Sequence, residues 1–104
     1  MKAETVKIYA LVDPTTGKIR YVGWTAGELN KRLKGHLLDP RSAIMARWLR
    51  GLKAKGIEPQ IKRLSTVLWE NRHKKEREWI IKLADDGEPL LNRIHNPNKS
   101  GRKI

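Results

Sequence analysis

Two alternating apolar segments joined by a tight turn are the feature that most constrains the fold of this chain. Residues 6–12, VKIYALV, and residues 19–24, IRYVGW, are rich in β-branched and aromatic side chains, which favours a strand in both places. The segment between them, DPTTGK, contains Asp, Pro and Gly, and each has its own reason to turn a chain. Strands this close in sequence pair as an antiparallel hairpin, so we expect the fold to be built on a sheet.

Two helices are predicted directly after the hairpin. Thr25 and Glu28 have the spacing of a capping box, and the Asp-Pro pair at 39–40 breaks the helical pattern. Between them leucines recur at helical spacing, at positions 29, 33 and 37. The second helix is expected to start near Ser42 and to close at Gly56. Its predicted apolar stripe consists of Ile44, Met45, Trp48, Leu49 and Leu52.

One more strand and one more helix complete the predicted order. Residues 59–67, PQIKRLSTV, favour a strand, and residues 71–84 favour a helix that ends at DDG. Its inward-facing residues are predicted to be Trp79, Ile80 and Leu83. The order ββααβα predicts an α+β fold, in which a small, mainly antiparallel three-stranded sheet is flanked by helices. We expect residues 1–95 to form the single domain and residues 96–104 to form a basic, flexible tail.

The charge of the chain indicates its class of partner. Twenty-three Lys and Arg against eleven Asp and Glu leave a net charge of +12, which attracts polyanions, and nucleic acid is the expected partner. An anionic membrane surface is the weaker alternative, because we find neither a basic amphipathic helix with a wide apolar face nor a lipidation signal. The absence of cysteine excludes disulfides, zinc ribbons and thiol nucleophiles. No signal peptide or membrane-spanning segment is visible in the sequence, so we expect a cytoplasmic protein.

Several residues are candidates for a chemical role, although each also has an ordinary structural explanation. The chain has two tyrosines, Tyr9 and Tyr21, one on each predicted strand, where Tyr is a common residue. Arg32 and His36 are four residues apart and therefore share a helix face. An arginine offers donors suited to phosphate oxygens, and a histidine exchanges a proton near neutral pH. On a basic helix, however, such a pair is ordinarily a solvated face.

Three further positions have similarly ordinary explanations. Glu76 lies among Lys74, Lys75 and Arg77, where a carboxylate is normally an ion-pair partner. Gly23 lies inside a predicted strand, where glycine often marks a bulge. Asn92 follows two leucines, and there it would ordinarily be a turn residue or a cap of backbone groups.

Taken together, these residues resemble the GIY-YIG nuclease family. KIY at 7–9 and YVG at 21–23 are similar to its two name-giving motifs, and LNKRLKGH at 29–36 is similar to its Leu-x-x-Arg-Leu-x-x-His helix. EREWI at 76–80 and LLN at 90–92 resemble its glutamate helix and terminal asparagine. The resemblance covers residues 6–92. It departs from the family at Lys7, which replaces the first glycine of the name, a residue that serves backbone freedom rather than chemistry.

The resemblance implies a metal-dependent DNA endonuclease that hydrolyses phosphodiester bonds with a single divalent ion. Glu76 would hold Mg²⁺ or Mn²⁺ near the leaving 3′ oxygen, and a single carboxylate with water and phosphate is a normal arrangement for Mg²⁺. Tyr9 would position or deprotonate the attacking water, with His36 as the acceptor of its proton. Arg32 would stabilise the charge that develops on the phosphoryl oxygens. Tyr21 would bind the phosphate or order water, and Asn92 would buttress the site.

The DNA, duplex or branched, is predicted to contact five basic residues: Lys7, Lys31, Lys34, Arg41 and Arg47. The module is more similar to phage or mobile-element members of the family than to repair proteins, which would place it in the cytoplasm of a host cell. Two alternatives remain open. One is a catalytically inactive nucleic-acid-binding domain of the same fold, and the other is a ribosome-associated or structural basic protein whose motif matches are due to chance. The complete set of Tyr, Arg, His and Glu favours the nuclease, because a mere binder has no use for a carboxylate beside phosphate.

Overall fold

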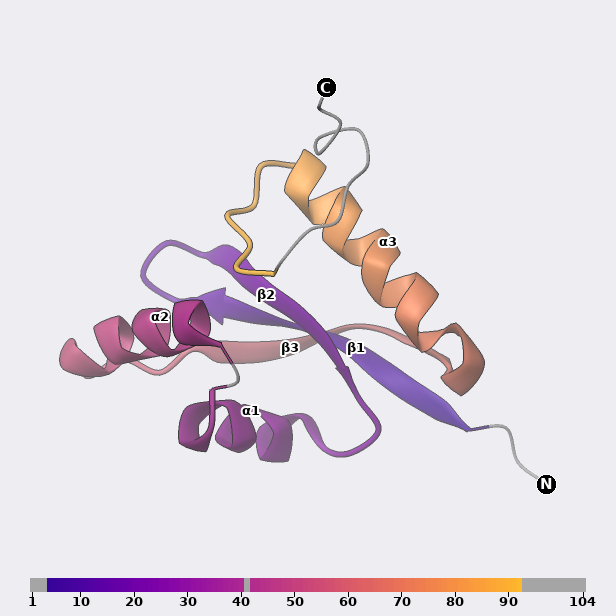
Figure 1. Ribbon diagram of the computed structural model, residues 1–104, viewed down its shortest axis with the longest axis horizontal. Coiled ribbons are helices and arrows are strands. Elements are labelled where there is room, and N and C mark those ends of the chain that lie inside the picture. The colour runs from indigo at the N-terminus through magenta and orange to yellow at the C-terminus, as the bar shows by residue number, and fades with distance from the viewer. Residues whose placement is uncertain (1–3, 41, 93–104) are drawn as a thin grey trace.

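Three strands form an antiparallel sheet in the order β2-β1-β3 (Figure 1), in a computed structural model that describes residues 4–40 and 42–92. The order of elements is ββααβα and the fold is α+β, as the sequence predicted. The elements are β1 (Thr5–Asp13), β2 (Lys18–Thr25), α1 (Leu29–Leu38), α2 (Ala43–Ala54), β3 (Gln60–Leu68), the 3₁₀ turn η1 (Trp69–Asn71) and α3 (Arg72–Asp85). Among these described elements, no helix is both long and apolar enough to cross a bilayer.

The sheet lies between two layers of helices, with α1 and α2 on one face and α3 on the other (Figure 1). The central strand β1 is buried continuously from Ile8 to Asp13, as expected of a strand that is covered on both faces. Alternate β1 side chains enter different cores. Ile8, Ala10 and Val12 face α3, whereas Tyr9 and Leu11 face α1 and α2.

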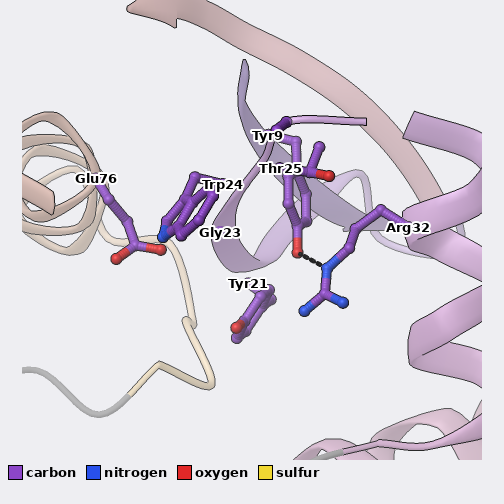
Figure 2. A pocket seen from close by; sticks show the side chains of 8 residues that line it. Tyr9, Tyr21, Gly23, Trp24, Thr25, Arg32 and Glu76 are labelled. Carbon is purple, nitrogen blue, oxygen red and sulfur yellow. Dashed lines mark hydrogen bonds between the residues drawn. The ribbon is translucent and has the colours of Figure 1, made fainter. Parts of the chain in front are cut away.

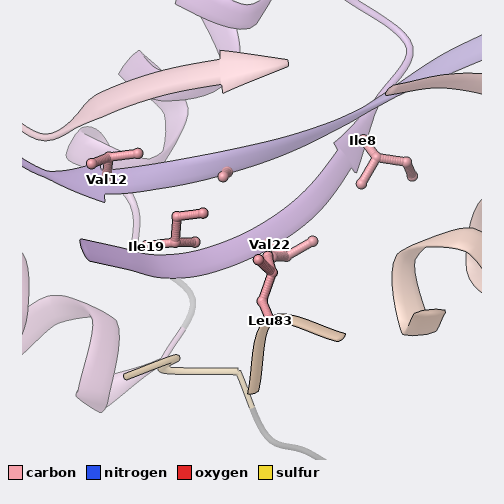
Figure 3. Close-up of a cluster of buried hydrophobic side chains, with 6 residues drawn as sticks. Ile8, Val12, Ile19, Val22 and Leu83 are labelled. Atoms are coloured by element: carbon pink, nitrogen blue, oxygen red, sulfur yellow. The ribbon is translucent and has the colours of Figure 1, made fainter. Parts of the chain in front are cut away.

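The core between the sheet and α3 follows the predicted pattern. Leu83 is buried in it (Figure 3). Trp79 and Ile80 pack against it, so all three residues face inward as predicted. The Trp79 indole N–H also donates to the Ser65 hydroxyl of β3 at 3.1 Å. These contacts fix the rotation of α3 about its axis, and therefore determine where its other side chains point.

A β-bulge decides which core each end of β2 enters. Leu11 pairs with Tyr21 and Val12 pairs with Ile19, so Arg20 is the extra residue of β2. A one-residue insertion inverts the alternation of side chains beyond it. Ile19 consequently joins the core beneath α3, while Tyr21 lies on the same face as Tyr9.

The start of α1 differs from the prediction. Glu28 occupies the cap position without a side-chain hydrogen bond, so the predicted capping box of Thr25 and Glu28 is wrong. Thr25 still belongs to β2, where it pairs with Lys7, and its hydroxyl accepts the backbone N–H of Gly27 at 3.1 Å. Sheet pairing therefore extends the strand through the residue that the local pattern assigned to the helix.

The limits of α2 agree with the prediction, but one residue of its stripe does not. Ser42 caps the helix by accepting the backbone N–H of Met45 at 3.1 Å. Gly56 follows the helix with a φ of 71°, a conformation that closes helices and favours glycine. Ile44, predicted to face inward, is 60% exposed, because it is one position away from the buried stripe of Met45, Leu49 and Leu52 and points to a different side of the helix.

After α3 the chain turns back and covers the free edge of β2. Glu88 accepts the backbone N–H of Ile19 at 2.8 Å, and Arg20 donates from Nε to the carbonyl of Pro89 at 2.6 Å. Leu91 donates its backbone N–H to the carbonyl of Arg20. An exposed sheet edge is thereby protected without a fourth strand. The predicted boundary between domain and tail, after residue 95, lies outside the described residues.

Candidate active site

The hydroxyl of Tyr9 lies between the two α1 residues that the sequence singled out. Its oxygen is 2.6 Å from Nε2 of His36, and Nε of Arg32 donates to it at 3.1 Å (Figure 2 shows the second bond). An arginine can only donate, whereas the direction of the Tyr9–His36 bond depends on the tautomer of the ring: Tyr9 donates to Nε2 when the ring proton is on Nδ1. Tyr9 is fully buried and His36 is only 3% exposed. The interpretation of His36 as part of a solvated helix face is therefore wrong.

Burial controls the acidity of Tyr9. It raises the pKa of the phenol to about 12, and the hydrogen bond from Arg32 only partly opposes this effect. The nearby Tyr21 and the negative charge of Glu76 raise the pKa further. Tyr9 is therefore a neutral phenol near pH 7, and it becomes a base only if its proton moves to His36.

Gly23 makes room for the Tyr9 ring. The two residues are directly opposite each other on β2 and β1, in a stretch of regular pairing, so interpreting Gly23 as a bulge is wrong. A Cβ atom at position 23 would lie 2.5 Å from the Tyr9 hydroxyl oxygen and 2.7 Å from Cζ. A side chain here would displace the ring from Arg32 and His36.

Tyr21 completes an aromatic group around the same hydroxyl. Its ring centroid lies 6.4 Å from that of Tyr9 and 5.2 Å from that of His36, and it meets His36 at an interplanar angle of 71°. Edge-to-face contacts of this kind add to the energy of burial and fix the orientation of the rings. The His36 ring is thus held by one tyrosine from each strand.

Glu76 reaches the same pocket from the opposite helical layer. It is half-buried, and it lines a pocket of about 350 Å³ together with Tyr9, Tyr21, Gly23, Trp24, Thr25, Ala26 and Arg32 (Figure 2). Burial raises the pKa of its carboxyl group. Glu76 has no hydrogen bond or ion pair with the residues that the structure describes, whereas Lys75 pairs with Glu78 at 3.2 Å. The ordinary explanation of Glu76, an ion pair with a neighbouring lysine, is therefore wrong.

A divalent cation fits this carboxylate. An unpaired, half-buried carboxylate gains from a nearby positive charge, and Mg²⁺ commonly takes one or two protein carboxylates and completes its shell with water and substrate phosphate. Within residues 4–40 and 42–92 there is no cluster of three or more Asp, Glu, His or Cys side chains placed to hold a metal ion. Glu76 is accordingly the residue that would hold such an ion in this pocket.

Asn92 lies behind the pocket, against the backbone of β2. Its side-chain oxygen accepts the N–H of Val22, and its side-chain nitrogen donates to the carbonyl of Val22, both at 2.8 Å. This pair of bonds anchors the edge strand between Tyr21 and Gly23. Asn92 thus caps backbone groups of β2, at the position where the sequence predicted a residue that buttresses the site.

The predicted DNA-contacting residues are not gathered in the pocket. Lys7 donates to the carbonyl of Gly27 at 3.0 Å, and it thereby ties down the loop that leads into α1. Lys31, Lys34 and Arg47 are exposed on α1 and α2, and Arg41 lies outside the described residues. The sequence reasoning missed Trp24, Thr25 and Ala26 as pocket residues. Their position directly after YVG was the available signal.

Comparisons with known protein families, curated proteins and solved structures found no match to this chain. The interpretation of the pocket therefore depends on the positions and chemistry of its own residues.

Proposed function

We propose that this protein is a metal-dependent DNA endonuclease that hydrolyses phosphodiester bonds by a GIY-YIG-type single-metal mechanism. The observation that carries the proposal is the Tyr9 hydroxyl bonded to both Arg32 and His36 in a pocket with the half-buried carboxylate of Glu76. The net charge of +12 supports a polyanionic substrate.

Tyr9 and His36 act on the attacking water in this proposal. Tyr9 transfers its proton to Nε2 of His36, which is 2.6 Å away, and the phenolate oxygen then takes a proton from a water molecule. The water oxygen bonds to phosphorus as the bond from phosphorus to the leaving 3′ oxygen breaks, and the leaving oxygen then takes a proton from solvent. His36 keeps the proton that left Tyr9, which explains why a tyrosine with a pKa of about 12 is usable near neutral pH.

In this proposal, Arg32 and Glu76 help to stabilise the negative charge that develops during the reaction. Nε of Arg32 is occupied by Tyr9, which leaves its terminal nitrogens for the phosphoryl oxygens, where negative charge develops. Glu76 would hold Mg²⁺ or Mn²⁺, which neutralises charge on the phosphate and on the leaving oxygen when bound. Asn92 and Gly23 position the strand and the ring on which these steps depend.

Two glutamates on α3 provide a matched test. Glu76 lines the pocket, whereas the side chain of Glu78 is 52% exposed and pairs with Lys75. We expect wild-type protein to cut supercoiled, linear or branched DNA with Mg²⁺ or Mn²⁺ and to stop in EDTA. Glu76→Gln should abolish cleavage in a folded protein, and Glu78→Gln should cleave almost normally.

The same assay separates the proposal from its alternatives. Cleavage that persists in EDTA would remove the single-metal mechanism. DNA binding without cleavage in any divalent metal would support an inactive binding domain of the same fold. Equal loss of cleavage in the two glutamine variants would exclude Glu76 as the specific metal ligand.

A further inference from the structure

A cluster of aromatic and cationic side chains lies where β3 ends and α3 begins. Trp24 and Trp69 meet edge-to-face, with ring centroids 5.4 Å apart and an interplanar angle of 89°. The guanidinium carbon of Arg72 lies 3.6 Å from the ring centroid of Trp69 and 5.2 Å from that of Trp24. A terminal nitrogen of Arg72 donates to the backbone carbonyl of Trp69 at 2.8 Å, which fixes the guanidinium on the ring. His73 adds a third ring, 6.1 Å from Trp24.

The cluster adjoins the candidate active site. Trp24 lines the pocket together with Glu76, and Figure 2 shows it next to Glu76, on the side of the pocket away from Arg32. Arg72 is four residues before Glu76 on α3, so the two side chains project from the same side of the helix, one turn apart. A DNA strand whose phosphate occupies the pocket therefore has this cluster as a neighbour.

Packing alone does not account for Trp69. Trp24 is half-buried and packs against the core beneath α3, which is sufficient reason for its presence. Trp69 is 39% exposed, although a large apolar side chain such as an indole is highly buried on average. The Nε of Arg72 is buried without a hydrogen-bond partner in the described part of the chain. The cluster thus presents a partly exposed indole with a fixed positive charge over one face of its ring, which leaves the opposite face for a ligand.

These two features match the chemistry of a single-stranded nucleic acid. Bases stack on aromatic side chains irrespective of sequence, and a nearby arginine adds cation–π and phosphate attraction. Paired bases in a duplex are already stacked on their neighbours, so only an unpaired base offers its face to Trp69.

We propose that Trp69, supported by Trp24 and Arg72, stacks on an unpaired nucleobase next to the scissile bond, so that the substrate is DNA with a single-stranded segment at the cleavage site. This inference rests on the proposed nuclease function and specifies its substrate class. A strictly duplex substrate would leave the exposed indole unused.

The test measures binding in EDTA, where no metal-dependent cleavage occurs. The probes are a duplex with a short single-stranded extension and the same duplex with abasic sites throughout the extension. Wild-type protein should bind the first probe about 5- to 150-fold more tightly, which corresponds to the stacking of one base. Trp69→Ala should lose this preference, and Trp69→Phe should retain part of it. Leu68→Ala is the matched control, because Leu68 is the adjacent residue and is also 39% exposed.

Two outcomes would overturn the inference. The first is an equal penalty for the abasic probe in wild-type and Trp69→Ala proteins, and the second is a Leu68→Ala variant that loses the preference as fully as Trp69→Ala. Circular dichroism establishes that each variant is folded, and Trp69→Phe supplies the comparison if the alanine variant is not. A protein that shows the Trp69-dependent preference but never cuts DNA would refute the nuclease function alone. A protein that cuts DNA with Mg²⁺ and shows no such preference would refute the stacking alone.

Discussion

Replacing Gly23 by alanine should damage both the stability and the activity of this protein, although glycine to alanine in a strand is often favourable. The new Cβ would lie 2.5 Å from the hydroxyl oxygen of Tyr9, 2.7 Å from its Cζ and 3.0 Å from Cε2 of Tyr21. Tyr9 is fully buried and cannot swing into solvent. Overpacking of this kind typically costs about 1–3 kcal/mol, and the clash with two rings places Gly23→Ala toward the upper end.

The activity should fall further than the stability suggests. Relief of the clash moves the Tyr9 oxygen away from His36 and Arg32, whose bonds to it are 2.6 and 3.1 Å long. A displacement on the order of 1 Å in a catalytic group can reduce the rate about 100-fold. Under the proposed mechanism, Gly23→Ala should therefore be a folded protein that cleaves almost no DNA.

Gly51→Ala is the matched control for this substitution. Gly51 lies in α2, and a Cβ added there meets nothing within 4 Å, so alanine should stabilise the protein by about 0.5–1 kcal/mol. Urea denaturation gives the free energy of unfolding of both variants, and DNA cleavage gives their activity. If Gly23→Ala were as stable and as active as Gly51→Ala, Tyr9 would not pack against position 23 as described.

Three further substitutions test the electrostatics and the support of the site. Burial raises the pKa of Glu76, so ionisation of its carboxyl group opposes folding at any pH above 4.5, the pKa of this group in the unfolded chain. Glu76→Gln should therefore stabilise the protein at pH 7. The gain should disappear below pH 4.5 in denaturation experiments. Burial raises the pKa of Tyr9 from 10.0 to about 12. The stability that the neutral phenol contributes is therefore complete below pH 10 and is lost as the pH rises through 12. Tyr9→Phe should accordingly lose less stability than wild type over that interval, by roughly 3 kcal/mol, and an equal loss would contradict the burial of the phenol. Asn92→Ala removes both bonds to Val22 and should cost about 1–3 kcal/mol in urea denaturation, whereas no change would show that the edge strand does not depend on this anchor.

Local sequence patterns were sufficient for the elements and their order. Alternation in residues 6–12 and 19–24, together with the leucine repeat of α1, depends on neighbours a few positions away, and these patterns predicted the elements correctly. The capping box failed because a tertiary contact, the pairing of Lys7 with Thr25, extends β2 at the expense of the helix. The spacing of residues cannot indicate how far a sheet partner extends a strand.

The geometry of the candidate site depended on features that the sequence does not display. A single extra residue, Arg20, determines that Tyr21 shares a face with Tyr9, and nothing in IRYVGW marks that insertion. The role of Gly23 depends on the identity of the residue opposite it, which only the register supplies. The motif selected the candidate residues, whereas the sheet register explains why glycine occupies position 23.

The way in which the two helical layers meet argues against a chance assembly of motifs. Tyr9, Arg32 and His36 come from the face covered by α1 and α2, and Glu76 comes from α3 on the other face, yet all but His36 line one pocket beside the edge strand. A basic protein selected only for stability would pair Glu76 with a lysine, as it pairs Glu78 with Lys75. Here the carboxylate is instead half-buried with a raised pKa, and the phenol opposite it is also held at a raised pKa. Perturbed groups of this kind cluster at functional sites more often than elsewhere, because their burial opposes folding and is therefore retained mainly where a function depends on it. The arrangement is therefore the support for proposing a phosphodiesterase, and the cleavage assay with Glu76→Gln and Glu78→Gln distinguishes that proposal from a structural basic protein and from a domain that only binds nucleic acid.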